Sequence, residues 1–382
     1  MLMMPALLWI KLENYWRLIK MVDLRKKLSV IKAMPLATGF ILAEDPDPEE
    51  IRRSGLKLAD LMQESCQRFE TPLAVPIMDL SLEKHALCAL LGINKEQEAR
   101  FHFETKPNVS ELLAKFDPLL HCYLRANIEA IASLAGADHY IAAGMSIGPF
   151  SLMTKLIADP ITPVYLAGMG MRDESVIVCD EVLALSMGLV KKYIAAQLDA
   201  GAKIIVLAEP AANMVYLSPK QIDEGSNVYK RYILENLLEL HSIMKAKGAG
   251  LFLHCCGDLS ADMLKGLAGL EPLVLSLGSS RVLWEDEEYI ASGTIIYGNL
   301  PSKKFFSNTE LTVEDVYTLS LELLSQMERT RHDFILGTEC DLLSVPGCHQ
   351  VIADKIDAMY RAKDNFYSKG GDISDTSRTL TH

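Results

Sequence analysis

His254 and Cys256 are the residues of this chain whose types and spacing most clearly predict chemistry. They lie in the apolar segment 251–257 (LFLHCCG), which has the composition of a buried strand. Side chains two residues apart on a strand point to the same face, so an imidazole and a thiolate could bind one ion from a single strand end. These ligand types suit zinc better than magnesium or calcium. Without a third ligand the pair is a weak signal, and both residues could instead belong to the core.

Cys340 is the candidate third ligand, because it ends another apolar run, residues 334–340 (FILGTEC). Three protein ligands and one open position are typical of catalytic zinc, whereas four protein ligands are typical of structural zinc. From the residues alone, a core role for Cys340 is equally compatible. Cys348 follows Pro346 and Gly347 and is a poorer candidate. Cys255 should point to the opposite face of its strand and pack against a helix.

The composition argues against several classes of protein. The chain has 382 residues and a formal net charge of −12, and its Lys and Arg residues are scattered. Nucleic-acid binding needs a basic patch, so we expect no nucleic-acid partner. The eight cysteines are too dispersed for a disulfide framework, which predicts a reducing, cytoplasmic location. The apolar segment 1–10 is too short for a membrane span and lacks the order of a secretory signal.

Short apolar runs alternate with helical patterns along the chain. Their continuous apolar character suits strands buried on both faces, as in a parallel sheet. Eight such units predict an α/β fold, a (β/α)8 TIM barrel. We expect an N-terminal helical extension over residues 1–30, the barrel over 31–365 and a flexible tail over 366–382. The runs are 34–43, 73–79, 138–145, 203–209, 249–256, 272–278, 293–299 and 332–340.

Polar residues close several of these runs. In a TIM barrel the active site lies at the C-terminal ends of the strands. Several strands that end in acids or metal-binding residues therefore indicate a site more strongly than any one of them. The residues are Asp79, Glu209, His254, Cys256, Asn299 and Cys340.

The order of motifs resembles the uroporphyrinogen decarboxylase superfamily over roughly residues 70–360. Within it, the closer resemblance is to the zinc-dependent, corrinoid-linked methyltransferases, such as the methylcobalamin:coenzyme M methyltransferases. The most specific match is HCCG at 254–257 followed by Cys340, which resembles the His-x-Cys…Cys zinc pattern of that branch. The other similar segments are GPFSL at 148–152, EPAAN at 209–213, LSP at 217–219 and GN at 298–299.

This resemblance implies a methyltransferase in which His254, Cys256 and Cys340 bind zinc. The methyl group would pass between a small-molecule donor or acceptor and a corrinoid (methylcobalamin) cofactor. The chain has no Asp-x-His-x-x-Gly corrinoid-binding motif, so the corrinoid should be carried by a separate protein partner. The positions at which this sequence differs from the methyltransferase branch slightly favour a component that demethylates a substrate, such as an O-demethylase. The apolar N-terminal helix could also make a homodimer contact.

Other features leave alternatives open. The arginine-rich loop of the decarboxylases is replaced by ATGFILAE at 37–44, which has no arginine to pair with porphyrinogen carboxylates. Asp79 resembles the decarboxylase acid, but the coenzyme M enzymes also tend to have an acid there. A metal-free decarboxylase is therefore the alternative function, and a non-catalytic scaffold is a third. We take Asp79 and Glu209 as the catalytic candidates. Glu209 could orient the zinc-bound histidine, bind zinc weakly, contact substrate or form a structural salt bridge.

Overall fold

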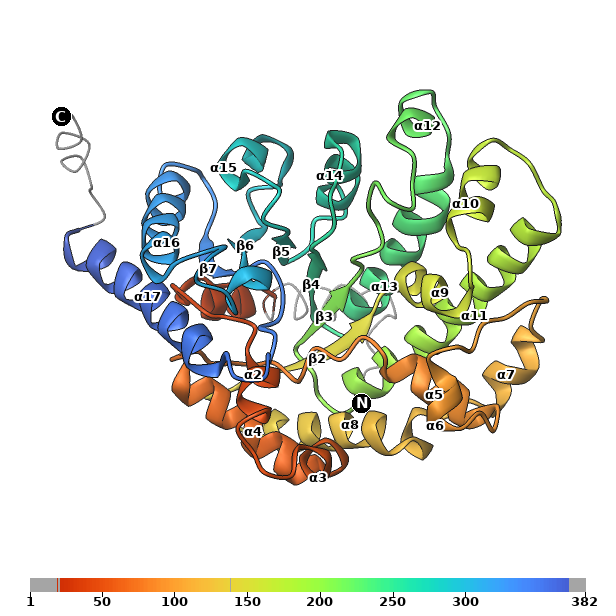
Figure 1. Cartoon of the computed structure of the whole chain (residues 1–382), viewed down its shortest axis with the longest axis horizontal. Coiled ribbons are helices and arrows are strands. Elements are labelled where there is room, and N and C mark those ends of the chain that lie inside the picture. Colours follow the sequence, from red (N-terminus) through yellow and green to blue (C-terminus); the bar gives the residue numbers. More distant parts are fainter. Residues whose placement is uncertain (1–18, 20, 138, 371–382) are drawn as a thin grey trace, which may run out of the picture.

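A parallel β-sheet of seven strands forms the centre of the molecule (Figure 1). The computed structural model describes residues 19, 21–137 and 139–370. Each strand pairs in parallel with the next one along the chain, so the order in the sheet is β1 to β7. The strands are β1 (Leu73–Ala74), β2 (Ile141–Ile147), β3 (Ile204–Ala208), β4 (Gly250–Cys255), β5 (Val274–Leu277), β6 (Ile295–Leu300) and β7 (Phe334–Thr338).

Helices surround the sheet on its outer side (Figure 1). Several begin at a residue whose side chain accepts a hydrogen bond from the first helical turn, such as Asp173, Ser260 and Thr312. The α-helices are α2 (Thr38–Leu42), α3 (Pro48–Arg53), α4 (Gly55–Arg68), α5 (Leu82–Leu90), α6 (Lys95–Glu98), α7 (Val109–Lys115), α8 (Cys122–Ala135), α9 (Pro149–Leu156), α10 (Ile161–Gly168), α11 (Glu174–Asp199), α12 (Pro219–Asp223), α13 (Glu235–Ala246), α14 (Ala261–Ala268), α15 (Leu283–Asp286), α16 (Val313–Met327) and α17 (His349–Ser368).

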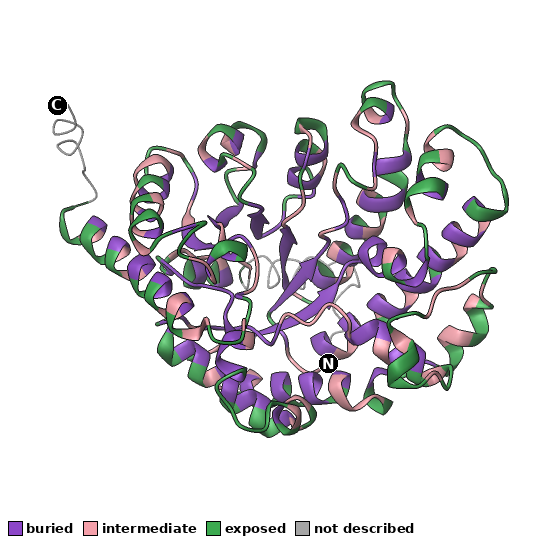
Figure 2. Cartoon of the chain, in the orientation of Figure 1, coloured by how far each residue is buried: buried purple, intermediate pink, exposed green. Residues whose placement is uncertain are grey.

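The strands are buried on both faces, as their continuous apolar sequences predicted (Figure 2). Alternate side chains of each strand enter two separate clusters. In β3, Val206 belongs to an inner cluster to which all seven strands contribute, whereas Leu207 packs against the surrounding helices. In β4, Phe252 is in the inner cluster and Leu253 in the outer one. One inner cluster shared by all seven strands shows that the sheet is curled.

The prediction of a strand at 34–43 was wrong. Residues 38–42 form the short helix α2, and the preceding segment makes a single parallel bridge, between Ala33 and Leu336 of β7. Two features limit strand formation here. Pro35 has no N–H to donate on the edge that faces away from β7, and the N–H of Leu36, which faces β7, donates to the side-chain hydroxyl of Thr338, 3.2 Å away. Seven of the eight predicted runs contain a strand, and the α/β class with a parallel sheet is confirmed.

The two ends of the chain are described only in part. Residues 21–29 are helical, and Leu24 and Leu28 pack into the inner cluster of the sheet. The rest of the predicted N-terminal extension, residues 1–18 and 20, lies outside the described residues. Helix α17 continues to Ser368, so it enters the predicted tail of 366–382, whose last twelve residues are also outside the description. Within the described chain, every helix is too short or too polar to cross a membrane.

Candidate metal centre

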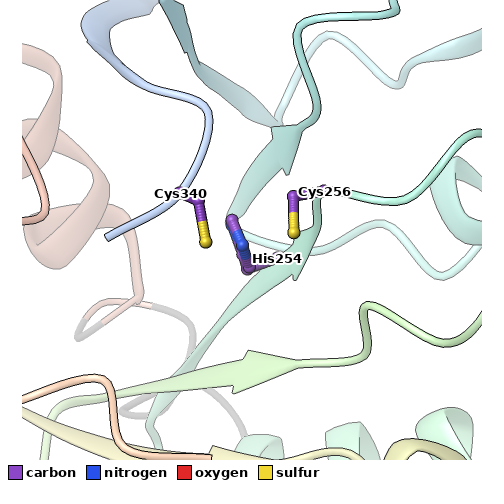
Figure 3. Close-up of side chains that lie close together, drawn as sticks. All are labelled: His254, Cys256 and Cys340. Carbon is purple, nitrogen blue, oxygen red and sulfur yellow. The ribbon is translucent and has the colours of Figure 1, made fainter. Parts of the chain in front are cut away.

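The structure brings together the side chains of His254, Cys256 and Cys340 (Figure 3). His254 lies near the end of β4, Cys256 directly follows that strand, and Cys340 is two residues beyond β7. One ligand atom from each lies within 4.8 Å of the others. Strands β4 and β7 are three strand spacings apart in the sheet, roughly 14 Å if the sheet were flat. The curl of the sheet is therefore what forms this group.

His254 is oriented as a metal ligand would be. Its side chain is buried, and its Nδ1 lies 2.9 Å from the hydroxyl oxygen of Ser276 on the neighbouring strand β5. Its Nε2 is also buried but has no hydrogen-bond partner within the described protein. A buried polar atom without a partner costs free energy, about 1–3 kcal/mol. If Nδ1–H donates to Ser276, the lone pair of Nε2 is left free for an ion, and the donor set of one imidazole and two thiols fits zinc.

The two cysteines are electrostatically coupled. A hydrogen bond from the Cys340 thiol lowers the pKa of Cys256 well below its usual value, against the effect of burial, and His254 and Lys303 act in the same direction. The pKa of Cys340 is raised correspondingly, because the pair retains one proton between its two sulfurs. Cys256 is therefore set up as a thiolate, which is the form that binds metals.

The neighbouring Cys255 has a different environment. It is fully buried in the outer cluster, and burial raises its pKa to about 12. Its side chain thus lies on the opposite face of β4 from His254, as the strand period requires. Cys348 directly precedes α17 and is not part of the metal-ligand group.

Lys303 and Glu339 lie beside this centre. Glu339 directly precedes Cys340, whereas no residue pattern connected Lys303 with the site. Glu339 is buried, and its Oε2 accepts hydrogen bonds from the N–H and the hydroxyl of Ser279, at 3.1 and 2.8 Å. Lys303 follows β6, and its Nζ lies 3.7 Å from the same carboxylate oxygen and 3.5 Å from the carbonyl oxygen of Cys256. Ser276 was missed as well, although a serine in the apolar strand VLSL was a usable signal.

Glu209 follows β3, and its carboxylate accepts hydrogen bonds from the backbone at the start of helix α9. The Oε1 accepts a hydrogen bond from the backbone N–H of Ser151 at 2.6 Å, and the Oε2 accepts one from Phe150 at 3.2 Å. Burial raises the pKa of Glu209 to about 7, although the bonds from Ser151 and Phe150 oppose that rise. A carboxylate at a helix N-terminus is a stabilising arrangement. Glu209 is not a member of the group formed by His254, Cys256 and Cys340.

Asp79 lies in the segment that follows β1 and is also outside the metal-ligand group. Its Oδ2 is 2.8 Å from Nη1 of Arg52, and its Oδ1 accepts hydrogen bonds from the backbone and side chain of Ser81. Burial alone would raise the pKa of Asp79, but these hydrogen bonds and the charge of Arg52 lower it below its usual value. Asp79 lines a cavity of about 350 Å³ together with His85 and Glu98.

The predicted strand-end residue Asn299 is structural, since its amide donates to the carbonyl groups of Gly278 and Arg281.

The fold and the site together define an α/β protein with a candidate three-ligand metal centre at the C-terminal ends of its strands. Residues 41–353 match the uroporphyrinogen decarboxylase (URO-D) family. The chain therefore belongs to this family, in agreement with the superfamily resemblance seen in its motifs.

Among solved structures, the chain is similar to a methyltransferase from Methanosarcina mazei. The TM-score is 0.63 and the sequence identity is 17%, and the match covers 88% of this chain and 94% of the other. At this identity the likeness shows a shared fold. A comparison with curated proteins found no match.

Proposed function

We propose that this protein is a zinc-dependent methyltransferase of a corrinoid system. It moves a methyl group between a small molecule and a corrinoid held by a partner protein. Two observations carry the proposal. A ring nitrogen of His254 lies within 4.8 Å of the ligand atoms of Cys256 and Cys340, and the buried Nε2 of His254 has no hydrogen-bond partner in the described chain. The structural likeness to a methyltransferase adds support.

His254, Cys256 and Cys340 would hold the zinc, and Ser276 would fix the imidazole through Nδ1. Zinc in such a site acts as a Lewis acid, which favours the anionic form of a thiol or polarises the heteroatom of a methyl donor. In-line displacement at a methyl carbon requires the attacking atom, the methyl carbon and the leaving atom to lie on one line. The three side chains, held at the ends of buried strands, would fix one of these atoms, the heteroatom of the small molecule. We also infer that the curled sheet closes into a (β/α)8 barrel, with residues 32–36 in the place of the eighth strand.

The test is the metal content of the purified protein, measured by plasma mass spectrometry without a metal-affinity tag. Wild type should contain about one zinc per chain, and Cys340→Ser should lose most of it. Cys348→Ser is the matched control, because Cys348 is half-buried but outside the ligand group, and it should keep its zinc. The zinc protein should then demethylate methylcobalamin in the presence of a thiol. The change in the absorbance of methylcobalamin measures this reaction. A properly reconstituted wild type without zinc would refute the proposal.

A metal-free decarboxylase is the second candidate, because the chain belongs to the uroporphyrinogen decarboxylase family and Asp79 lines a cavity. The segment 37–44, which takes the place of the decarboxylase arginine loop, contains the buried helix α2 and has no arginine. Release of carbon dioxide from a porphyrinogen by the zinc-free protein would favour this function. Its absence, with zinc present, would favour the methyltransferase.

A further inference from the structure

A cavity of about 350 Å³ lies between residues of helices α3, α5 and α6 and the start of α8, which are in the lower part of Figure 1. A cavity of this volume can hold a small molecule. His254, Cys256 and Cys340 do not line it, so it is separate from the candidate metal centre. Most of the side chains in its wall are charged or polar. The charges that remain unpaired therefore decide which ligand it can bind.

Two of the three acidic side chains in the wall are paired with arginines. The Oδ2 of Asp79 is 2.8 Å from Nη1 of Arg52. The Oε1 of Glu49 accepts a hydrogen bond from Nε of Arg53 at 2.8 Å and another from the hydroxyl of Tyr123. These pairs are close to neutral, so neither acid is left to bind a cation.

The third acid, Glu98, is paired with His85. The hydroxyl of Ser81 donates to Oδ1 of Asp79, 2.5 Å away, so its oxygen can only accept from Nε2 of His85, at 2.8 Å. The Nδ1 of His85 contacts the carboxylate of Glu98, which is also an acceptor. Both ring nitrogens of His85 therefore carry a hydrogen, and the charged ring neutralises Glu98.

Lys95 is the cation that remains. It is the first residue of α6, it is exposed, and its ammonium group forms no ion pair with the described part of the chain. The three acid–base pairs leave no net charge. Lys95 thus gives the wall of the cavity one surplus positive charge.

The N-terminus of helix α8 adds to this positive potential. Cys122 and Tyr123, its first two residues, line the cavity, and no side chain accepts a hydrogen bond from its first turn. The N-cap residue His121 also lines the cavity, and its Nδ1 is buried without a partner among the described residues. Burial and the charge of His85 lower the pKa of His121, so its ring is neutral and can donate from Nδ1. A buried polar atom without a partner points to a bound molecule that supplies one.

We propose that this cavity binds phosphate, free or as the phosphate group of a small ester, between Lys95 and the N-terminus of α8. A phosphate monoester carries about −1.5 to −2 charges at pH 7. The surplus lysine and the roughly +0.5 charge of a helix N-terminus together match this better than they match the single charge of a carboxylate. Nδ1 of His121 donates to one of the phosphate oxygens. The site is independent of the proposed methyl transfer.

The test is calorimetric titration of the full chain with inorganic phosphate, glycerol 3-phosphate and acetate at constant ionic strength. Wild type should bind a phosphate about tenfold or more tightly than acetate, the effect of one additional charged hydrogen bond. Lys95→Gln should weaken phosphate binding about three- to tenfold. Lys106→Gln is the matched control, because Lys106 is exposed and does not line the cavity, and it should bind as wild type does. Tighter binding of the ester would identify an organic phosphate as the ligand, and tighter binding of inorganic phosphate would identify the free ion.

A pair of substitutions at Cys122 provides the sharper comparison. Cys122→Asp places a carboxylate inside the cavity at the first turn of α8, where it stabilises the helix and repels phosphate, so binding should be lost. Cys122→Asn has nearly the same shape without the charge and should retain binding. Melting temperatures show that both variants are folded. Three results would overturn the inference: a wild type that binds neither phosphate, acetate bound as tightly as phosphate, or equal phosphate affinity in the two Cys122 variants.

Discussion

Gly148→Ala should destabilise the protein by driving the Glu209 carboxylate away from helix α9. A Cβ at residue 148 would lie 2.1 Å from Oε2 of Glu209 and 2.3 Å from its Cδ, closer than real contacts allow. The backbone of Gly148 has a φ of −72°, which alanine adopts without strain, so the effect is purely steric. Moving the carboxylate breaks its hydrogen bonds to the N–H groups of Phe150 and Ser151.

The expected cost follows from these two hydrogen bonds. Above about pH 7, where Glu209 is ionised, each hydrogen bond to its charged carboxylate contributes about 1.5–3 kcal/mol, so two contribute roughly 3–6 kcal/mol. The reduced entropy of the unfolded chain returns about 0.4–1 kcal/mol in any Gly→Ala substitution. The free energy of unfolding should therefore fall by roughly 2–5 kcal/mol. Gly136→Ala is the control, because nothing lies within 4 Å of a Cβ at that position, and it should change stability by less than about 1 kcal/mol.

Urea unfolding of a double-mutant cycle with Glu209→Ala separates this mechanism from others. Removing the carboxylate first should make Gly148→Ala nearly neutral, which gives a coupling energy of about 2 kcal/mol or more. An equal cost of Gly148→Ala in both backgrounds would refute the reasoning. The experiment also bears on the role of Glu209. If its carboxylate were free to serve as a catalytic group, Gly148→Ala would reduce activity and leave stability intact.

Three further predictions concern buried residues of the core and the site. Ser276→Ala should weaken zinc binding about 10- to 100-fold, because it removes the partner that orients His254. Competition with a chromogenic chelator would measure the zinc affinity, and an unchanged affinity would contradict the role of Ser276. Burial raises the pKa of Glu83 to about 7, so the folded state binds more protons than the unfolded state between about pH 4.5 and 7, and the free energy of unfolding should fall as the pH rises through that range. Glu83→Gln should reduce this pH dependence by roughly 3 kcal/mol in urea titrations, and an identical slope would exclude Glu83 as its source. Gly337→Ala should lower the melting temperature by several degrees, because its Cβ would lie 2.3 Å from the ring of the fully buried Tyr297. A melting temperature equal to that of wild type would contradict this contact.

Much of the fold could be predicted from the sequence because it depends on local pattern. Strands buried on both faces have continuous apolar sequences, and seven of the eight predicted runs contain a strand. The run at 34–43 was wrongly predicted to be a strand because its composition is as apolar as that of the seven runs that do contain strands. What limits strand formation there is the missing N–H of Pro35 and the hydroxyl of Thr338, a residue about 300 positions away.

Part of the candidate site could likewise be predicted from local sequence pattern, and part depended on tertiary structure. The types of His254 and Cys256 and the two-residue period of a strand were enough to place both side chains on one face of β4. Cys340 joins them only because the sheet curls and brings the end of β7 to the end of β4, so its place depended on tertiary structure.

The partners of the site residues were decided by packing alone. A serine in an apolar strand marked Ser276 as unusual, but it did not name His254 as its partner. Nor did the sequence show that Lys303 would lie near Cys256 or that Glu209 would cap helix α9. Residue type and period fix which way a side chain points from its own strand. What it meets there depends on how the strands and loops are arranged around it, which the tertiary fold sets.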